Sequence, residues 1–243
     1  MRAHRLVLAA SPLAMIMALT ACVSADNDPP AATEGFAEHM HGHLEQISAV
    51  KAAVIAGDLE AAREPATWLA EHQEPPGMPD AWAPYVNDMR MQASVAASAE
   101  NIETVAVAVS EIARSCGSCH AATGFAVAFG YDQRPPAEEQ NLMTQMQRHL
   151  WAADRMWEGL IGPSDIAWEW GTEMLAEVQL AGSQITDAPD KKARVDELVE
   201  QIRDVGSTGS TAPAGPSRSA MYGQFLSLCA NCHSLTGGGP GTT

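Results

Sequence analysis

Residues 229–233, Cys-Ala-Asn-Cys-His, decide the fold that we expect for this chain, because of where they stand. The same pattern occurs 113 positions earlier as Cys-Gly-Ser-Cys-His, residues 116–120. In this sequence ten residues, 234–243, follow the later copy, and none of them is Met or His. Any side chain that completes a site with residues 229–233 is therefore expected from an earlier part of the chain.

Both stretches match the attachment motif of c-type haem, in which two cysteines three positions apart are followed by histidine. Each thiol bonds a haem vinyl group, and the imidazole binds the iron from one side. One helical turn lets the two sulfur atoms reach neighbouring vinyl groups. We therefore expect two covalent haem c groups as cofactors, with thioethers at Cys116, Cys119, Cys229 and Cys232 and proximal iron ligands at His120 and His233.

Three other uses of paired cysteines explain the pattern less well. A four-cysteine zinc site normally has its two pairs about 15 to 20 residues apart, which is far closer than the pairs are here. A thioredoxin-like redox pair needs βαβ surroundings, which this composition does not favour. Structural disulfides would not require a histidine at the same place in both copies.

Composition favours helices and excludes one class of partner. Hydrophobic residues make up 46% of the 243 residues, aromatic residues 5%, and the formal net charge is −16. The excess of alanine and leucine predicts an all-α fold. The acidic balance disfavours nucleic-acid binding, because a polyanion needs a surplus of Lys and Arg, and it predicts a basic docking face on any partner.

The N-terminus resembles a bacterial lipoprotein signal. Arg2 and Arg5 precede an apolar stretch, residues 6–19, and a small-residue cleavage site ends at Cys22. We expect residues 1–21 to be removed, Cys22 to be lipidated and residues 22–34 to form a flexible tether; an ordinary secretory signal cut near Ala25 is the alternative. Loss of two arginines changes the net charge of −16 to −18. Either signal predicts export to the periplasm or cell envelope, and the lipid would anchor the protein to a membrane.

An internal repeat divides the remainder into two halves. Residues 40–44 and 146–150 are similar at an offset of 106, whereas the motifs are offset by 113. We place the seven extra residues in the loop-like segment 206–216 and the boundary near 131–136. The expected domains are 35–130 and 131–243. The expected helices are 35–56, 59–73, 81–99, 102–119, 137–161, 164–181, 188–205 and 217–233, with the second one bent or shortened by Pro65.

Motif position and helical pattern together resemble class II c-type cytochromes, the cytochrome c-prime group. The resemblance implies two tandem antiparallel four-helix bundles, each with haem c attached near the C-terminal end of its fourth helix and covered by its first helix. Gly124 and Gly237 depart from the group, which commonly has a basic residue there. The distal pocket of that group often has no protein ligand and binds small gases.

The first helix of each half carries candidate distal ligands. His43 and His149 occupy equivalent places in the repeat, as do Met40 and Met146. We favour the two histidines, keep the two methionines and a vacant site as alternatives, and expect His72 at the surface. The inward stripes are predicted as Ala37, Met40, His43, Leu44, Ile47, Val50 and Val54, and as Met143, Met146, His149, Leu150, Ala153, Met156 and Leu160.

These features predict a dihaem cytochrome that transfers single electrons between periplasmic or envelope redox proteins, and not an enzyme. A gas-binding or sensing haem protein with an open iron is one alternative. A dihaem peroxidase is another, although members of that family keep their motifs near the start of each domain.

Overall fold

A computed structural model describes residues 31–127, 129–130, 133–136 and 141–239, and the side chains from residue 35 onward. These residues form eight α-helices and two short 3-10 turns, with no strand among them, so the expected all-α class is confirmed. The helices are α1 (Ala31–Ala56), α2 (Leu59–Glu71), α3 (Ala83–Ser98), α4 (Ile102–Thr123), α5 (Leu142–Ile161), α6 (Asp165–Ala176), α7 (Pro189–Gly209) and α8 (Pro216–Thr236).

Local sequence explains where four of the helices begin. Asp58, Asn101, Asn141 and Ser164 each precede a helix and accept a hydrogen bond from a backbone N–H of its first turn. Such side chains satisfy donors that a helix start leaves unpaired. Pro65 lies buried inside α2, which continues through it to Glu71.

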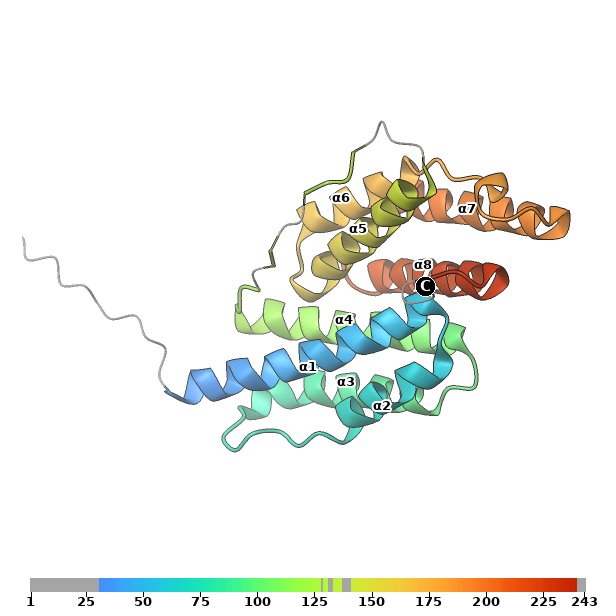
Figure 1. Cartoon of the computed structure of the whole chain (residues 1–243). Helices are drawn as coiled ribbons and strands as arrows, with labels where there is room; N and C mark the ends of the chain where they lie inside the picture. The colour runs from blue at the N-terminus through green and yellow to red at the C-terminus, as the bar shows by residue number, and fades with distance from the viewer. Residues whose placement is uncertain (1–30, 128, 131–132, 137–140, 240–243) are drawn as a thin grey trace, which may run out of the picture.

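The helices fall into two groups in chain order, α1–α4 and α5–α8, as Figure 1 shows. Within each group, every helix packs against the next one. The groups meet where α4 packs against α8, with α1 also against α8 and α4 also against α5. The two helices that carry the cysteine motifs thus form the centre of the molecule.

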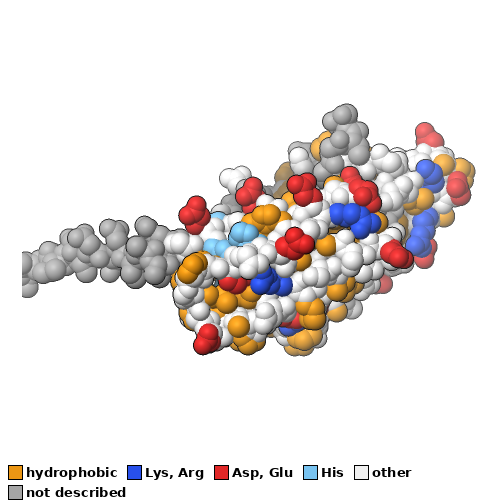
Figure 2. Space-filling model, turned by 90° about the horizontal axis from the view of Figure 1, so that it is seen from below, with side chains coloured by type: hydrophobic (Ala, Val, Ile, Leu, Met, Phe, Trp, Pro, Cys, Tyr) orange, Lys and Arg blue, Asp and Glu red, His pale blue; other side chains and the backbone are white. Residues whose placement is uncertain are grey.

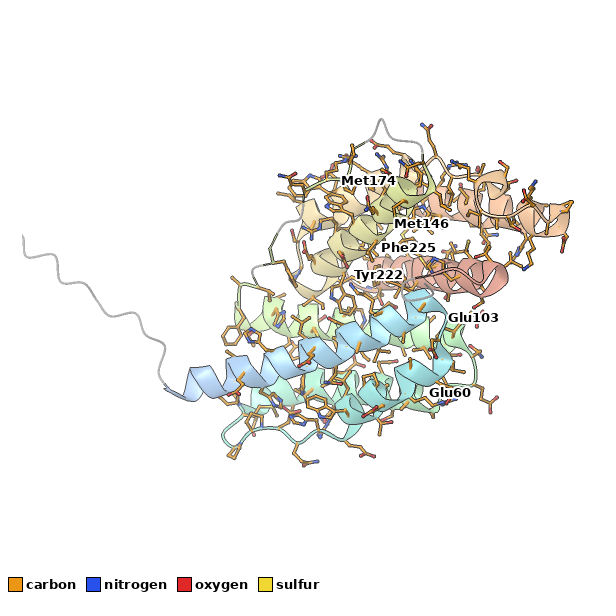
Figure 3. All side chains as sticks on the ribbon, in the orientation of Figure 1. Glu60, Glu103, Met146, Met174, Tyr222 and Phe225 are labelled. Carbon is orange, nitrogen blue, oxygen red and sulfur yellow. The ribbon has the colours of Figure 1, made fainter. Side chains whose placement is uncertain are left out.

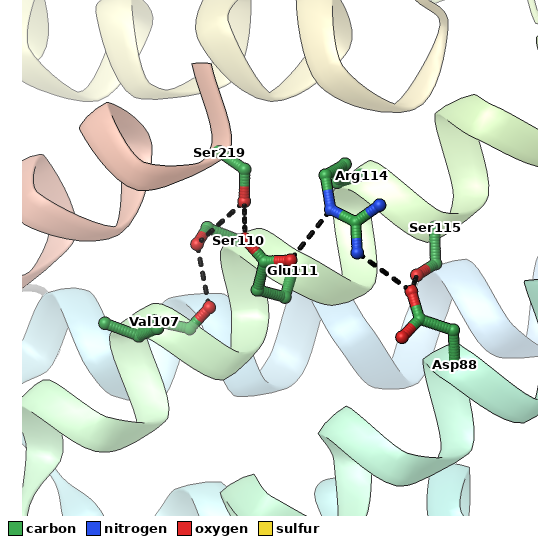
Figure 4. A network of polar contacts seen from close by, with 7 residues as sticks. All are labelled: Asp88, Val107, Ser110, Glu111, Arg114, Ser115 and Ser219. Carbon is green, nitrogen blue, oxygen red and sulfur yellow. Dashed lines mark hydrogen bonds and ion pairs between the residues drawn. The ribbon is translucent and has the colours of Figure 1, made fainter. Parts of the chain in front are cut away.

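Small residues allow α4 and α8 to approach closely. A Cβ atom added to Gly223 would lie 2.9 Å from Oγ of Ser110 and 3.2 Å from Cα of Val107. Ser219 donates a hydrogen bond to Oε1 of Glu111 over 2.5 Å (Figure 4). Residue numbers rise along α8 while those of its contacts fall along α4, so the two helices run antiparallel.

Large buried side chains fill the interior of the second group. Met174, Tyr222 and Phe225 are fully buried there (Figure 3). The Tyr222 hydroxyl donates to the Ala153 carbonyl over 3.0 Å, which satisfies its only polar atom without water.

Three sequence expectations need correction. Helix α1 begins at Ala31, inside the segment 22–34 expected as a tether. Helix α7 continues to Gly209, so the first part of segment 206–216 is helical and not loop. Three members of the two predicted inward stripes face away from the core, since Met143 and Leu150 are 68% and 47% exposed and Ala37 is exposed as well.

Helix α5 buries a wider face than the single predicted stripe. Thr144 and Trp151, which directly follow the exposed Met143 and Leu150, are both buried, and so is Arg148.

No helix in the described part of the chain is long and apolar enough to cross a membrane. The predicted signal, residues 1–21, the lipidation site Cys22 and the tether up to residue 30 lie outside the described residues.

Candidate functional site

Each cysteine motif lies in the last two turns of its helix, and the two helix ends are built alike. Thr123 Oγ1 donates to the Cys119 carbonyl, and Thr236 Oγ1 donates to the Cys232 carbonyl. The next residue, Gly124 or Gly237, caps the helix with φ of 74° or 70°. Glycine adopts this left-handed conformation without strain, which explains its presence at both helix ends.

The four motif cysteines are free thiols and form no disulfide with one another. Burial, with the neighbouring cysteine as a smaller cause, raises the pKa of Cys116 and of Cys229 to about 12. Both thiols are therefore protonated at pH 7.

Both motif histidines are held through Nδ1 by a backbone carbonyl. His120 donates from Nδ1 to the Ile161 carbonyl over 2.7 Å, and His233 donates from Nδ1 to the Ile55 carbonyl over 2.5 Å. In a neutral imidazole this hydrogen bond places the proton on Nδ1 and leaves the lone pair on Nε2, which is the state that a metal-binding imidazole requires.

His149 is placed by α5 inside the second group of helices. It is 9% exposed, and its Nε2 atom has no hydrogen-bond partner. Desolvation by burial lowers its pKa to about 4, and the nearby His233 contributes to the lowering. The two histidines therefore lie close enough to influence each other, and the His149 imidazole is neutral at pH 7.

His43, the equivalent residue on α1, lies in a cluster of histidines. Nitrogen atoms of His39, His43 and His72 lie within 4.8 Å of one another. His43 is 8% exposed, its Nε2 has no partner, and burial followed by the charges of His39 and His72 lowers its pKa to about 3. His39 Nε2 contacts Glu74 Oε2 at 2.9 Å.

His72, expected at the surface, is half-buried and stacks on Trp68 with ring centroids 3.8 Å apart. The reason is that α2 ends beside α1, which turns this imidazole toward the ring of His39. Met40 and Met146, the alternative distal ligands, are both half-buried on the same helices as His43 and His149.

Sequence reasoning missed a pair of arginines. Arg90 on α3 donates to the His72 carbonyl, and Arg203 on α7 donates to the Val178 carbonyl over 2.8 Å. Arg90 also lowers the pKa of His43 as Arg203 lowers that of His149. The two arginines are 113 positions apart, as are the cysteine motifs. This shared offset is the sequence signal by which they could have been predicted.

Helices α3 and α7 begin at an offset of 106, at Ala83 and Pro189, and end at an offset of 111, at Ser98 and Gly209. The next helices, α4 and α8, begin at an offset of 114. The extra residues of the second half therefore lie partly within α7 and partly in the connection after it, so the expected placement in segment 206–216 is only partly right.

A cavity of about 250 Å³ opens between α1 and α5 and is lined in part by Lys51, Asp154 and Trp157. None of the motif cysteines or candidate iron ligands lines it, so we assign it no role in the site.

The donors present fit a c-type haem. Free thiols one helical turn apart, imidazoles with Nδ1 occupied and a buried imidazole with an unpartnered Nε2 are the groups that such a cofactor uses. Comparison with known proteins finds no family model, no curated protein and no solved structure that matches this chain.

Proposed function

We propose that this protein is a dihaem c-type cytochrome that transfers single electrons between redox partners in the bacterial periplasm or cell envelope. The observation that carries the proposal is the state of the two motif histidines, each of which hydrogen-bonds through Nδ1 and keeps Nε2 for a metal. Neither a disulfide nor a thiolate site would need this arrangement.

When bound, haem c supplies the one-electron iron couple, and the protein supplies attachment, axial ligands and surroundings. Cys116 and Cys119 would hold one haem and Cys229 and Cys232 the other. His120 and His233 would be the proximal ligands, which their Nδ1 hydrogen bonds keep in the correct tautomer.

His149 is the proposed distal ligand of the second haem, because it is buried, neutral at pH 7 and near His233. His43 is the proposed distal ligand of the first haem on its equivalence to His149. Its neighbours His39 and His72 give that haem two further imidazoles, a choice that the second half does not offer.

The finer architecture belongs to the same proposal. Each group of helices would be an antiparallel four-helix bundle with its haem near the C-terminal end of the fourth helix. The consecutive packing of helices within each group and the position of both motifs in the last two turns of α4 and α8 support it.

The antiparallel pairing of α4 and α8 directs the two motifs toward opposite ends of the helix pair. His120 lies nine residues beyond the contact residue Glu111, and His233 fourteen beyond Ser219. A rise of 1.5 Å per residue separates the two histidines by on the order of 30 Å along the pair. We therefore propose that each haem meets a partner at its own end of the molecule.

Charge supports a basic partner. On the face drawn in Figure 2, Asp and Glu side chains are spread widely, and Lys and Arg occupy fewer places. The net charge of the full chain is −16. Docking through such a surface would be fast at low salt and slower at high salt.

Purification from a host that attaches haem c tests the function. We expect two haems per polypeptide by pyridine haemochrome assay and by mass, two one-electron steps in a redox titration, and low-spin paramagnetic resonance signals. A chain without covalent haem would contradict the proposal. Rapid stoichiometric binding of CO at both ferrous haems would favour the gas-binding alternative instead.

A further inference from the structure

The two motif histidines are bonded by carbonyls that come from the opposite group of helices. His120 on α4 bonds Ile161, the last residue of α5, and His233 on α8 bonds Ile55, near the end of α1. Ile55 and Ile161 are offset by 106, so they occupy equivalent places in the repeat. Each half therefore supplies the carbonyl group that bonds the motif histidine of the other half.

Helix geometry explains why these carbonyls are available. The last four carbonyls of a helix have no partner within the helix, and the C-terminus carries a partial negative charge. An imidazole N–H that reaches this end satisfies a carbonyl and is polarised by it. The stronger the hydrogen bond at Nδ1, the more basic Nε2 becomes as a metal ligand.

Close packing at both junctions holds the bonds in place. A Cβ added to Gly117, inside the first motif, would lie 1.9 Å from the Leu160 carbonyl oxygen. A Cβ added to Gly57, in the turn after α1, would lie 2.6 Å from Ser234 Oγ and 3.1 Å from the Ala230 carbonyl oxygen. Each junction thus depends on a glycine. Gly117 lies on the motif helix α4, and Gly57 lies in the turn that faces α8.

We propose that each half of the protein positions the proximal histidine of the other half, through the end of its own first helix. The inference rests on the proposed function and adds that neither half alone forms a complete haem site. Ile55 and Ile161 act through their backbone carbonyls as positioning residues, and the reduction potential of each haem depends on the contact between the halves.

Gly117→Ala in the full-length, haem-loaded protein tests this. The atoms nearest to the added methyl group belong to the backbone of Leu160, so the methyl group must displace the end of α5 from His120. We expect both haems to stay attached and the potential of one haem to rise, since a weaker hydrogen bond makes the imidazole a poorer donor to ferric iron. The effect should be on the order of a tenfold change in its reduced-to-oxidised ratio, which is 59 mV for one electron.

Ser118→Ala, one residue along the same motif, removes an oxygen atom and adds none, and should leave both potentials unchanged. Two attached haems with unaltered potentials in Gly117→Ala would overturn the inference and leave the proposed function standing. A wild-type chain without haem would overturn both.

If Gly117→Ala loses a haem, NMR spectroscopy of the native protein tests the two hydrogen bonds directly. The Nδ1 protons of His120 and His233 should exchange slowly with solvent and show proximity to the α-protons of Ile161 and Ile55. Rapid exchange at both rings would contradict the proposed bonds.

Discussion

Lys51 on α1 and Asp154 on α5 form an ion pair between the two halves of the protein, with Nζ 2.7 Å from Oδ1. The Lys51 side chain is 11% exposed, and its ammonium group also lies 5.2 Å from the ring centroid of Trp157. Both partners come from the first helix of their half, so the pair joins the same two helices whose ends bond the motif histidines.

Replacement of Lys51 by Met should reduce the free energy of unfolding by about 1 kcal/mol, because it leaves a partly buried carboxylate without its partner. Arg194→Met is the matched control, since its pair with Glu197 is exposed on both sides and should contribute less than about 0.5 kcal/mol. Urea denaturation measures both. Equal losses in the two variants would show that the Lys51 pair adds nothing to the junction.

Removal of one cysteine pair should remove one haem. Cys116→Ala combined with Cys119→Ala should give one covalent haem per chain, and so should the same change at Cys229 and Cys232, because no thioether can then form at that motif. Pyridine haemochrome and mass measurements count the haems. Retention of two covalent haems in either double variant would contradict the assignment.

The two candidate distal histidines should respond differently to replacement. His149→Ala should convert one haem from low spin to high spin in the paramagnetic resonance spectrum. His43→Ala should have a smaller effect, because His39 and His72 offer nitrogen atoms within 4.8 Å of the lost one. Gln147→Ala, at an exposed position of α5, is the control and should change neither spectrum. A fully low-spin His149→Ala protein would exclude this residue as a ligand.

Stability should fall as pH is lowered below about 6.5. His43 and His149 have pKa values lowered to about 3 and about 4, so between these values and 6.5 the unfolded chain binds more protons than the folded one. Unfolding is then favoured by acid, by at most about 1.4 kcal/mol per pH unit for each histidine. His149→Gln should flatten the dependence measured from pH 4.5 to 6.5. An unchanged slope would show that His149 is not buried as a neutral base.

Gly206→Ala should destabilise the protein by about 1–3 kcal/mol, because its Cβ would lie 2.3 Å from the backbone nitrogen of Ala176. Gly35→Ala is the control within α1, where nothing lies within 4 Å of the added atom. That change should stabilise the helix by about 0.5–1 kcal/mol. Thermal unfolding of both variants checks the two signs, and equal effects would contradict the close approach of α7 to α6.

Much of the helical layout could be predicted because its causes are local. The glycine and aspartate at 57–58 end one helix and cap the next, and Asn101 caps α4, each through atoms a few residues away. The prediction failed where packing overrides composition. Gly206 belongs to a helix because its missing side chain lets α7 approach α6, although the residues around it read as a loop.

The helical class, the repeat and the two motifs could be read from the sequence alone, because cysteine spacing, capping and helical periodicity act over a few residues. The surroundings of those motifs depend instead on how the helices pack. The carbonyls of Ile55 and Ile161 are backbone atoms that every residue has, and no sequence pattern distinguishes them. They matter because the antiparallel contact of α4 with α8 brings each helix end to the histidine of the other half.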